Sequence, residues 1–484
     1  MKKLLSVMLV FAIVFASMSV AAEEFNNEED FSFDAYDSFE VIASEEAVLM
    51  EIDVDVKEAL EEKLTSAWDS LAAEVQLYPD VKIHRNDIVS YFSTIFFENP
   101  QYYYVVRKFS ATTNSAGYIG KLYNLVYSVD DMESVNKTRE KIDGAVKEIL
   151  FNISCDMTDF EKVMTVHDYM VNNYIYDISD ADQTYLILLD KVGVCAAYAE
   201  AFQHVMNVIG IESTIVKSDS MGHMWNMVKI DGRWYHADVT WDDPDQMGRI
   251  SHQHMFLSQN AIEDLGHYGI DAPYNAISTV YNNAEWHDDM SAMVTAEGVM
   301  YRVEGNNLID ETGNTIYEKL DGGDGFWATT QTTGVKDEIF ASLCEINGVL
   351  YFNTDTGIYS YNPKTRETAT VLEEYGIFGL YSDKNMIYYS TYDFEEQAFV
   401  KKGELKVCGS FVKESYYEDG KAVVKLYNDN DSPIWAISEG EGYKICKVEA
   451  KSVDIIEFEN GNSQTIYVWT QGLQPVVEAF MVSE

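Results

Sequence analysis

With 484 residues, 47% of them hydrophobic and 24% charged, the chain holds more apolar material than one ordinary domain needs, and about two to four folded units are expected. Its 34 Lys and Arg residues stand against 81 Asp and Glu residues, and the net charge of −47 argues against nucleic acid as a partner because like charges repel. Five cysteines are too few for a disulfide scaffold, although Cys408 and Cys446 remain candidates for a pair within the last domain.

Residues 1–22 predict a secretory signal peptide. Two lysines open the chain, an apolar run follows, and two alanines precede acidic residues as at a cleavage site. The alternative is a membrane anchor, but the apolar run is shorter than the ~20 residues that a bilayer span needs. We therefore expect a secreted protein, free or held non-covalently at the cell surface, with no membrane span after signal removal. Residues 23–47 are acidic and lack periodicity, which predicts a disordered leader.

Residues 48–155 predict a region of helices and strands that packs on the following domain. Apolar residues recur at helical spacing from Val54 to Val75, from Asp87 to Phe97 and again from Val135 to Phe151. Pro100 ends the second helical pattern, and the stretch IGKLYNLVYSV beyond it is typical of strands.

Residues 156–275 carry the chemistry. A helix is predicted from Phe160 to Tyr174, with Thr158 and Glu161 in capping-box spacing ahead of it. The segment LDKVGVCAAYAEAFQHVMNVIGI then predicts a turn followed by a helix that starts near Cys195. In the first turn of a helix, unpaired backbone amides and the positive end of the helix dipole favour a thiolate. Taken alone, however, a cysteine ahead of an Ala-rich helix is more often a packing residue.

The segment HMWNMVKIDGRWYHADVTWDDP predicts a β-hairpin around Asp231-Gly232, a pair favoured in two-residue turns. With Ile230 opposite Arg233, side-chain alternation puts His223, Trp225, Asp238 and Thr240 on one face of the hairpin. His223 and Asp238 are then diagonal neighbours, about 7–8 Å apart by backbone and within reach of a hydrogen bond.

Cys195, His223 and Asp238 together match the needs of nucleophilic catalysis. A thiolate needs a proton acceptor, and that acceptor needs a partner that sets its tautomer and orientation. Each residue alone is more often structural, and the three together point to a cysteine nucleophile with an oriented base. Trp225, Trp241 and Tyr198 are the candidate walls of the pocket.

The segments that carry these three residues resemble the signature segments of the transglutaminase-like superfamily: GVCAAYAEAF, GHMWNMV and WYHADVTWDDP. The resemblance covers about Glu161 to Ser258, and the flanking elements resemble those of bacterial secreted members. It implies a papain-like α+β core in which the three residues form a Cys-His-Asp triad. Ala197 and Met224 depart from the pattern, which usually has Gly at the first position and a small residue at the second.

No metal or other cofactor is expected. His252, His254 and His236 lie near acidic residues, but adjacent residues on a strand alternate faces, and no HEXXH or CXXC pattern is present. His167 is predicted to be a structural residue on the core-facing side of its helix. A turn with Asp242, Asp243 and Asp245 is predicted to be a solvated loop, with calcium binding as the lesser alternative.

The C-terminal half predicts two β-rich accessory domains. In residues 276–404, GVMYRVEGNNLIDETGNTIYEKL resembles NGVLYFNTDTGIYSYNPKTRETATVL, and a weaker third copy follows. These repeats resemble propeller blades, although three copies are fewer than the ~4 blades of the smallest closed propellers, so a compact β domain is an equal alternative. Residues 405–484 predict a small β-sandwich.

The sequence leaves two functions open. In the first, a secreted enzyme attacks protein or peptide amides through Cys195 and passes the acyl group to an amine, as a transglutaminase, or to water, as a protease or amidase. Its substrates would be proteins or peptides, including those of cell surfaces or cell walls. In the second, the core is a scaffold without activity and the β domains bind glycans or proteins. The intact set of three residues favours the enzyme.

Overall fold

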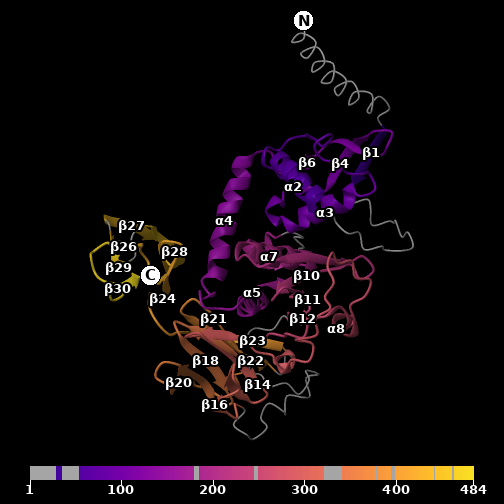
Figure 1. Cartoon of the computed structure of the whole chain (residues 1–484). Coiled ribbons are helices and arrows are strands. Elements are labelled where there is room, and N and C mark those ends of the chain that lie inside the picture. Colours follow the sequence, from indigo (N-terminus) through magenta and orange to yellow (C-terminus); the bar gives the residue numbers. More distant parts are fainter. Residues whose placement is uncertain are drawn as a thin grey trace, which may run out of the picture. The chain divides into compact units, whose positions relative to one another are not determined.

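The computed structural model describes residues 29–34, 54–178, 185–244, 249–320, 341–377, 379–393, 398–440, 442–459 and 463–483 (Figure 1). The predicted signal peptide lies outside these residues, as does most of the predicted leader. Within the leader, however, strand β1 (Glu29–Asp34) pairs antiparallel with β4 (Lys108–Thr113). The expected disorder is therefore wrong for β1, because β4 offers backbone groups to which the segment can hydrogen-bond along its length.

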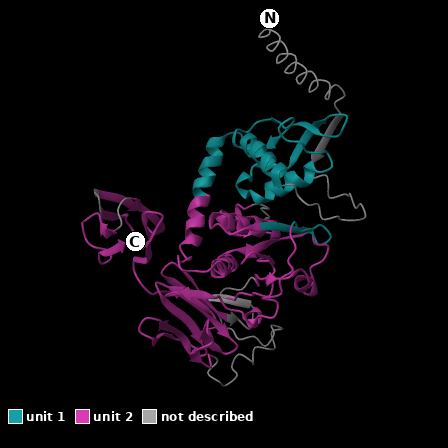
Figure 2. Ribbon diagram, in the orientation of Figure 1, with its two compact units in different colours: residues 1–141, 214–222, 271–273 teal, residues 142–213, 223–270, 274–484 magenta. Residues whose placement is uncertain are grey.

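The chain divides into two compact units (Figure 2). The first comprises residues 1–141, 214–222 and 271–273, and the second comprises residues 142–213, 223–270 and 274–484.

The described part of the first unit contains helices α2 (Val54–Asp69) and α3 (Ile88–Glu98), a short 3₁₀ turn, η1 (Pro100–Tyr102), and α4 (Met132–Leu150) as far as residue 141. Its larger sheet has the order β1-β4-β5-β2, with β5 at Ile119–Tyr123 and β2 at Glu74–Gln76. Two further strands, β3 (Val105–Val106) and β6 (Val126–Tyr127), pair with each other. Helix α2 ends earlier than predicted because Leu71 adopts a positive φ and the chain then enters β2. Trp68 is fully buried in the core of this unit.

The second unit begins with helices α4 (Met132–Leu150, its first residues in the first unit) and α5 (Asp159–Asn173). The predicted capping box is present, because the Thr158 side chain accepts from the Glu161 backbone and the Glu161 side chain accepts from the Thr158 backbone. A pair of short parallel strands, β7 (Ile175–Tyr176) and β8 (Val192–Gly193), and a short helix, α6 (Ile187–Asp190), lead into α7 (Cys195–Val208).

In the second unit, antiparallel strands of order β12-β11-β10 follow α7. They are β10 (His223–Ile230), β11 (Arg233–Ala237) and β12 (Met255–Leu257), and helix α8 (Gln259–Asp264) comes next. Strand β9 (Ser213–Ser218) belongs, apart from its first residue, to the first unit. Helix α7 packs against β10, where the Asn226 side chain donates to the Ala199 carbonyl over 3.0 Å.

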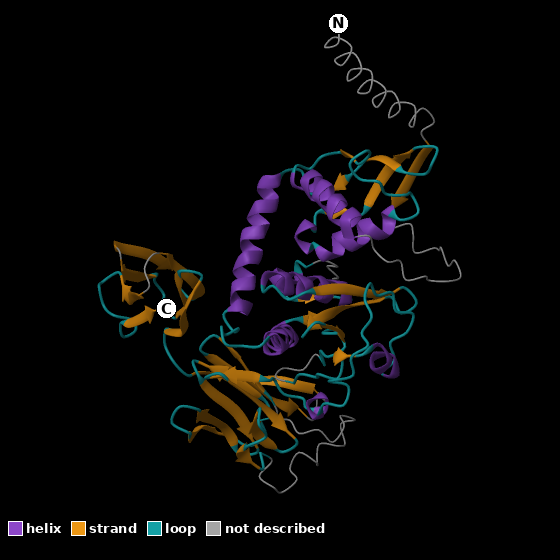
Figure 3. Ribbon diagram, viewed as in Figure 1, coloured by secondary structure: helices purple, strands orange, loops and turns teal. Residues whose placement is uncertain are grey.

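Beyond η2 (Glu285–Asp288) the described chain is built from strands (Figure 3). Three antiparallel sheets follow one another in sequence. They comprise β13 (Val294–Ala296), β14 (Val299–Glu304), β15 (Asn307–Asp310) and β16 (Thr315–Glu318); β17 (Leu343–Ile346), β18 (Val349–Thr354), β19 (Gly357–Asn362) and β20 (Glu367–Glu373); and β21 (Leu380–Asp383), β22 (Met386–Asp393) and β23 (Ala398–Lys406). The first two share a hydrophobic core that includes Leu308 and Phe352.

The last part of the chain forms two sheets of order β24-β25-β28 and β27-β26-β29-β30. Their strands are β24 (Phe411–Glu418), β25 (Lys421–Asn428), β26 (Ile434–Gly440), β27 (Gly442–Val448), β28 (Ser452–Glu459), β29 (Ser463–Thr470) and β30 (Phe480–Ser483). One core holds residues of both sheets, among them Leu426, Phe458 and Val468. The chain is therefore a mixed α and β protein whose candidate site lies in the helical part of the second unit.

Candidate active site

The hairpin of β10 and β11 has the register predicted from the sequence, from Ile230 opposite Arg233 to Asn226 opposite Ala237. Its turn residues Asp231 and Gly232 have φ of 51° and 74°. A two-residue type I′ turn needs a positive φ at both positions, and Asp tolerates one while Gly adopts it freely. The local sequence therefore sets which residues of the two strands face each other.

His223 opens β10 and Asp238 directly follows β11. The His223 Nε2 atom lies 2.6 Å from Asp238 Oδ2. The other oxygen, Oδ1, accepts from the backbone N–H groups of Thr240 at 3.1 Å and Trp241 at 3.2 Å. Asp238 is fully buried and His223 is 8% exposed, so the pair is shielded from water.

The two groups stabilise each other's charged forms. Burial of Asp238 opposes its ionisation, but hydrogen bonds from His223 and His267 outweigh burial and lower its pKa to about 2. Burial likewise opposes the imidazolium of His223, but hydrogen bonds to Asp238 and Cys195 outweigh it and raise the pKa of His223 to about 9. His223 thus holds a proton across the neutral range.

Cys195 is the first residue of α7 and is half-buried. Burial opposes its thiolate, but the hydrogen bond and charge of His223, together with the backbone groups of Met224 and Ala196, lower its pKa below the ordinary value. A sulfur at a helix start beside an imidazolium is the arrangement in which a thiol ionises readily.

The other four cysteines behave differently. Burial raises the pKa of Cys155 to about 11, and it raises that of Cys344, Cys408 and Cys446 as well. None of the five is in a disulfide, so the pairing considered for Cys408 and Cys446 is wrong. Cys408 packs at the edge of the core around β21 and β22, whereas Cys446 lies on β27 in the separate core of the last two sheets.

Two of the three candidate wall residues lie beside His223. The rings of Trp225 and Trp241 each stack on the His223 ring with centroids 5.4 Å apart. Trp225 is 1% exposed and donates from Nε1 to His236 Nδ1 over 3.1 Å, whereas Trp241 is 40% exposed. Tyr198 is buried, and its hydroxyl donates to Asp243 over 2.7 Å, so it ties α7 to the loop that follows Asp238.

A further residue of the site, His267, lies in the loop after α8 and is not among the residues predicted from the sequence. It is 1% exposed, and its Nε2 atom lies 2.9 Å from the same Asp238 Oδ2 that His223 contacts. Nothing in the local pattern around His267 signals this contact, because 29 residues separate it from Asp238.

A second cluster of buried titratable side chains lies in the same domain. Asp168 Oδ1 is 2.8 Å from both His167 Nδ1 and His252 Nε2, and Asp242 Oδ1 is 2.9 Å from His254 Nδ1. His167 Nε2 lies 3.5 Å from Asp242 Oδ2 and so links the two carboxylates. Burial opposes charge here as well, but the paired imidazoles outweigh it and lower the pKa of both Asp168 and Asp242. His167, which the sequence places on the core-facing side of its helix, is fully buried.

The predicted solvated turn at Asp242 is wrong, because Asp242 is fully buried. It accepts from the backbone and ring of His254 and from the Ser251 hydroxyl, which compensate for its lost hydration. Asp245 lies outside the described residues.

Two groups of three side chains in the described part of the chain have possible metal-binding atoms within 4.8 Å of one another. One is His167, Asp168 and His252, and the other is His223, Asp238 and His267. Hydrogen bonds account for both groupings, and we assign no metal ligand to either.

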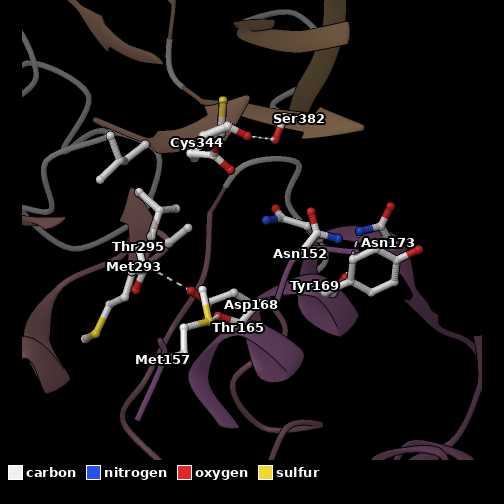
Figure 4. A pocket seen from close by; sticks show the side chains of 15 residues that line it. Asn152, Met157, Thr165, Asp168, Tyr169, Asn173, Met293, Thr295, Cys344 and Ser382 are labelled. Carbon is white, nitrogen blue, oxygen red and sulfur yellow. Dashed lines mark hydrogen bonds between the residues drawn. The ribbon is translucent and has the colours of Figure 1, made fainter. Parts of the chain in front are cut away.

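A cavity of about 90 Å³ adjoins this second cluster (Figure 4). Asp168 and Thr165 from α5 line it together with Met293 and Thr295 from near β13. The Met293 backbone donates to Asp168 Oδ2 over 2.8 Å. None of the predicted site residues lines this cavity, so it is separate from the surroundings of Cys195.

Comparison with known proteins bears on the same segment. A family model for the transglutaminase-like superfamily matches residues 147–239, a range that contains Cys195, His223 and Asp238. No curated protein matches the chain. In the described part of the chain, no helix is both long enough and apolar enough to span a membrane.

Several solved structures are distantly similar. A TGase shares 14% identity at a TM-score of 0.20, over 27% of this chain and 43% of that one. A candidate cysteine protease from Cytophaga hutchinsonii shares 18% identity at a TM-score of 0.18, over 28% and 53%. The extracellular domain of a candidate one-component system from B. thetaiotaomicron shares 12% identity at a TM-score of 0.17, over 56% and 50%. The chain thus spans about half the length of these proteins. Residues 147–239 of this protein are a domain of the transglutaminase-like superfamily.

Proposed function

We propose that this protein is a secreted thiol acyl-transfer enzyme that acts on protein or peptide amides, with Cys195 as nucleophile, His223 as its acid and base, and Asp238 as the residue that orients His223. The observation that carries the proposal is the geometry: Cys195 begins α7, and His223 Nε2 lies 2.6 Å from the buried Asp238. The electrostatics of the five cysteines agree with it. Cys195 has a lowered pKa beside an imidazole whose pKa is raised to about 9, while the pKa of each of the other four is raised.

The reaction follows from these charges. The Cys195 thiolate attacks the carbonyl carbon of the amide, and the backbone amides at the start of α7 stabilise the oxyanion that forms. His223 gives its proton to the amide nitrogen, the C–N bond breaks, and an amine leaves a thioester on Cys195. An amine or water then attacks the thioester carbon and loses a proton to His223. The C–S bond breaks, and the thiolate and the imidazolium are restored.

Alkylation by iodoacetamide across pH tests the site. We expect the peptide that carries Cys195 to react well below pH 8.5, the ordinary range of a free thiol. The exposed Cys155 is a control in the same molecule, since its pKa is raised to about 11. In His223→Ala the reactivity of Cys195 should move towards that of an ordinary thiol. If Cys195 reacts like an ordinary thiol and His223→Ala changes nothing, the enzyme is refuted and a binding protein on this scaffold becomes the better reading.

A second assay decides the acyl acceptor. The purified protein is given a glutamine-containing protein and a labelled primary amine, with Cys195→Ser as the control. Incorporation of label that depends on Cys195 identifies a transglutaminase, and release of peptides without incorporation identifies a hydrolase.

Secretion is part of the proposal and rests on the signal-peptide pattern of residues 1–22. N-terminal sequencing of the protein recovered from the culture medium should show a mature chain that begins near residue 23. A chain that retains its first residues in the cell would contradict it.

A further inference from the structure

Asp238 Oδ2 is shared by two imidazoles. His223 Nε2 lies 2.6 Å from it and His267 Nε2 lies 2.9 Å from it. An ionised carboxylate can only accept hydrogen bonds, so both nitrogens must carry a hydrogen. Because Nε2 of His223 faces Asp238, its other ring nitrogen, Nδ1, is the one available to Cys195. The hydrogen bond from His267 reaches the same Asp238 oxygen, Oδ2, that fixes this orientation of His223.

His267 is not explained by packing alone. Its ring lies 4.1 Å from the ring of Trp241 and 4.9 Å from that of Trp225, centroid to centroid, and it is 1% exposed. Its Nδ1 atom is buried and has no hydrogen-bond partner among the described residues. A buried polar atom without a partner is costly, and an apolar side chain would fill this space between the tryptophans without that cost. The contact with Asp238 is the interaction that an apolar residue could not replace.

We propose that His267 is a positioning residue that holds the Asp238 carboxylate in place and in its charged form, so that His223 stays oriented towards Cys195. The inference rests on the proposed function and extends the Cys195, His223 and Asp238 triad by a fourth member. His267 does not touch the sulfur; it acts through Asp238. The titratable groups around its ring are Asp238, His223 on β10, His236 on β11 and His254 in the loop before β12.

The charge balance explains why a second donor matters. Asp238 is fully buried, and burial is the largest influence opposing its ionisation. Two backbone N–H groups donate to Oδ1, whereas the hydrogen bonds to Oδ2 from the described residues come from the side chains of His223 and His267. Without His267 the position of Oδ2 would depend on His223, the residue that has to exchange protons during the reaction.

The test is the pH profile of Cys195 alkylation in His267→Leu, compared with wild type and with His287→Leu. His287 is also buried, but its Nε2 atom bonds the Met255 carbonyl, so its loss removes a buried imidazole without touching Asp238. From the usual strength of a hydrogen bond to a charged group, we expect His267→Leu to lower the rate of Cys195 alkylation at pH 5 by roughly 10- to 100-fold. The acid limb of its pH profile should move to higher pH by about one unit or more. His267→Gln should restore much of both, since its amide can reach where Nε2 lies.

His267→Asn covers the case in which the leucine variant does not fold, since its shorter amide cannot reach Asp238 and should behave like His267→Leu. A profile that keeps its acid limb and loses only amplitude, or one that His267→Gln fails to restore, overturns the inference and leaves His267 a packing residue. These outcomes differ from failure of the proposed function, in which wild-type Cys195 itself would react as an ordinary thiol.

Discussion

Asp238→Ala removes the acceptor of four hydrogen bonds at once, two of them buried and two partly buried. The donors are His223 and His267 through their Nε2 atoms and Thr240 and Trp241 through their backbone N–H groups. Alanine offers none of them a replacement, and His223 is left as a buried positive group without its carboxylate. Breaking a buried charged pair by removing one partner destabilises a protein by about 3–5 kcal/mol, and we expect that loss for this domain at pH 5.5.

The pH dependence of this loss has a definite sign. The folded pKa of Asp238, about 2, lies below the ordinary 3.8, so its contribution is present above the ordinary value and is lost as pH falls through about 2. The folded pKa of His223, about 9, lies above the ordinary 6.5, so its contribution is present below 6.5 and is lost as pH rises through about 9. Both describe the same ion pair. The difference between wild type and Asp238→Ala should therefore be largest between about pH 4 and 6.5 and decline on either side.

Hydrogen exchange followed by mass spectrometry measures the loss where it occurs. The amides of α7 and β10 report the unfolding free energy of this domain separately from the β-rich part of the chain. Asp264→Ala is the control, because Asp264 is an exposed carboxylate in the neighbouring helix α8 and should change stability by less than about 0.5 kcal/mol. A loss below about 1 kcal/mol at pH 5.5, or one that does not decline by pH 9, refutes this reasoning.

Three further changes test other parts of the fold. Thr158→Ala removes the capping box of α5 and should cost about 1 kcal/mol, measured by urea unfolding; an unchanged midpoint would contradict the cap. Gly357→Ala should destabilise the sheet of β17 to β20 by about 1–3 kcal/mol or more, because the added carbon would lie 1.9 Å from the Leu372 carbonyl oxygen, whereas Gly409→Ala, with nothing within 4 Å, should be neutral by the same measurement. Burial holds the pKa of His236 at about 4, below the ordinary 6.5, so the free energy of unfolding decreases as pH falls from about 6.5 to 4. In His236→Leu the decrease between pH 7 and 5 should be smaller by about 2 kcal/mol. An equal decline in both proteins would count against this.

Much of the helical part of the fold could be predicted from local patterns. The helix at Phe160–Tyr174 appears as α5, one residue offset, because the capping box and the apolar spacing act within a few residues of each other. The predicted end of the first helix at Val75 was wrong, since the chain leaves the helix after Asp69 to pair as β2 with a strand far along the sequence. The helical spacing of apolar residues gives no information about such pairing with a distant strand.

Asp242 is a second case in which the local sequence pattern and the tertiary structure disagree. Asp242 sits in a run of acidic side chains that predicts a solvated turn, yet it is fully buried between His254 and Ser251. Composition describes what an acidic turn usually does. The hydrogen bonds that compensate for the burial of Asp242 come from other segments of the chain. Only the tertiary structure brings those segments next to it, so the solvated turn could not be corrected from the sequence.

The amino-acid sequence by itself determines that Cys195 begins a helix and that the Asp231-Gly232 turn puts His223 and Asp238 on one face of a hairpin, because both follow from backbone preferences acting over a few residues. The tertiary structure alone decides that His267 joins them. Its hydrogen bond to Asp238 spans 29 residues and a helix, and a contact of that kind depends on how the whole domain packs rather than on any local pattern.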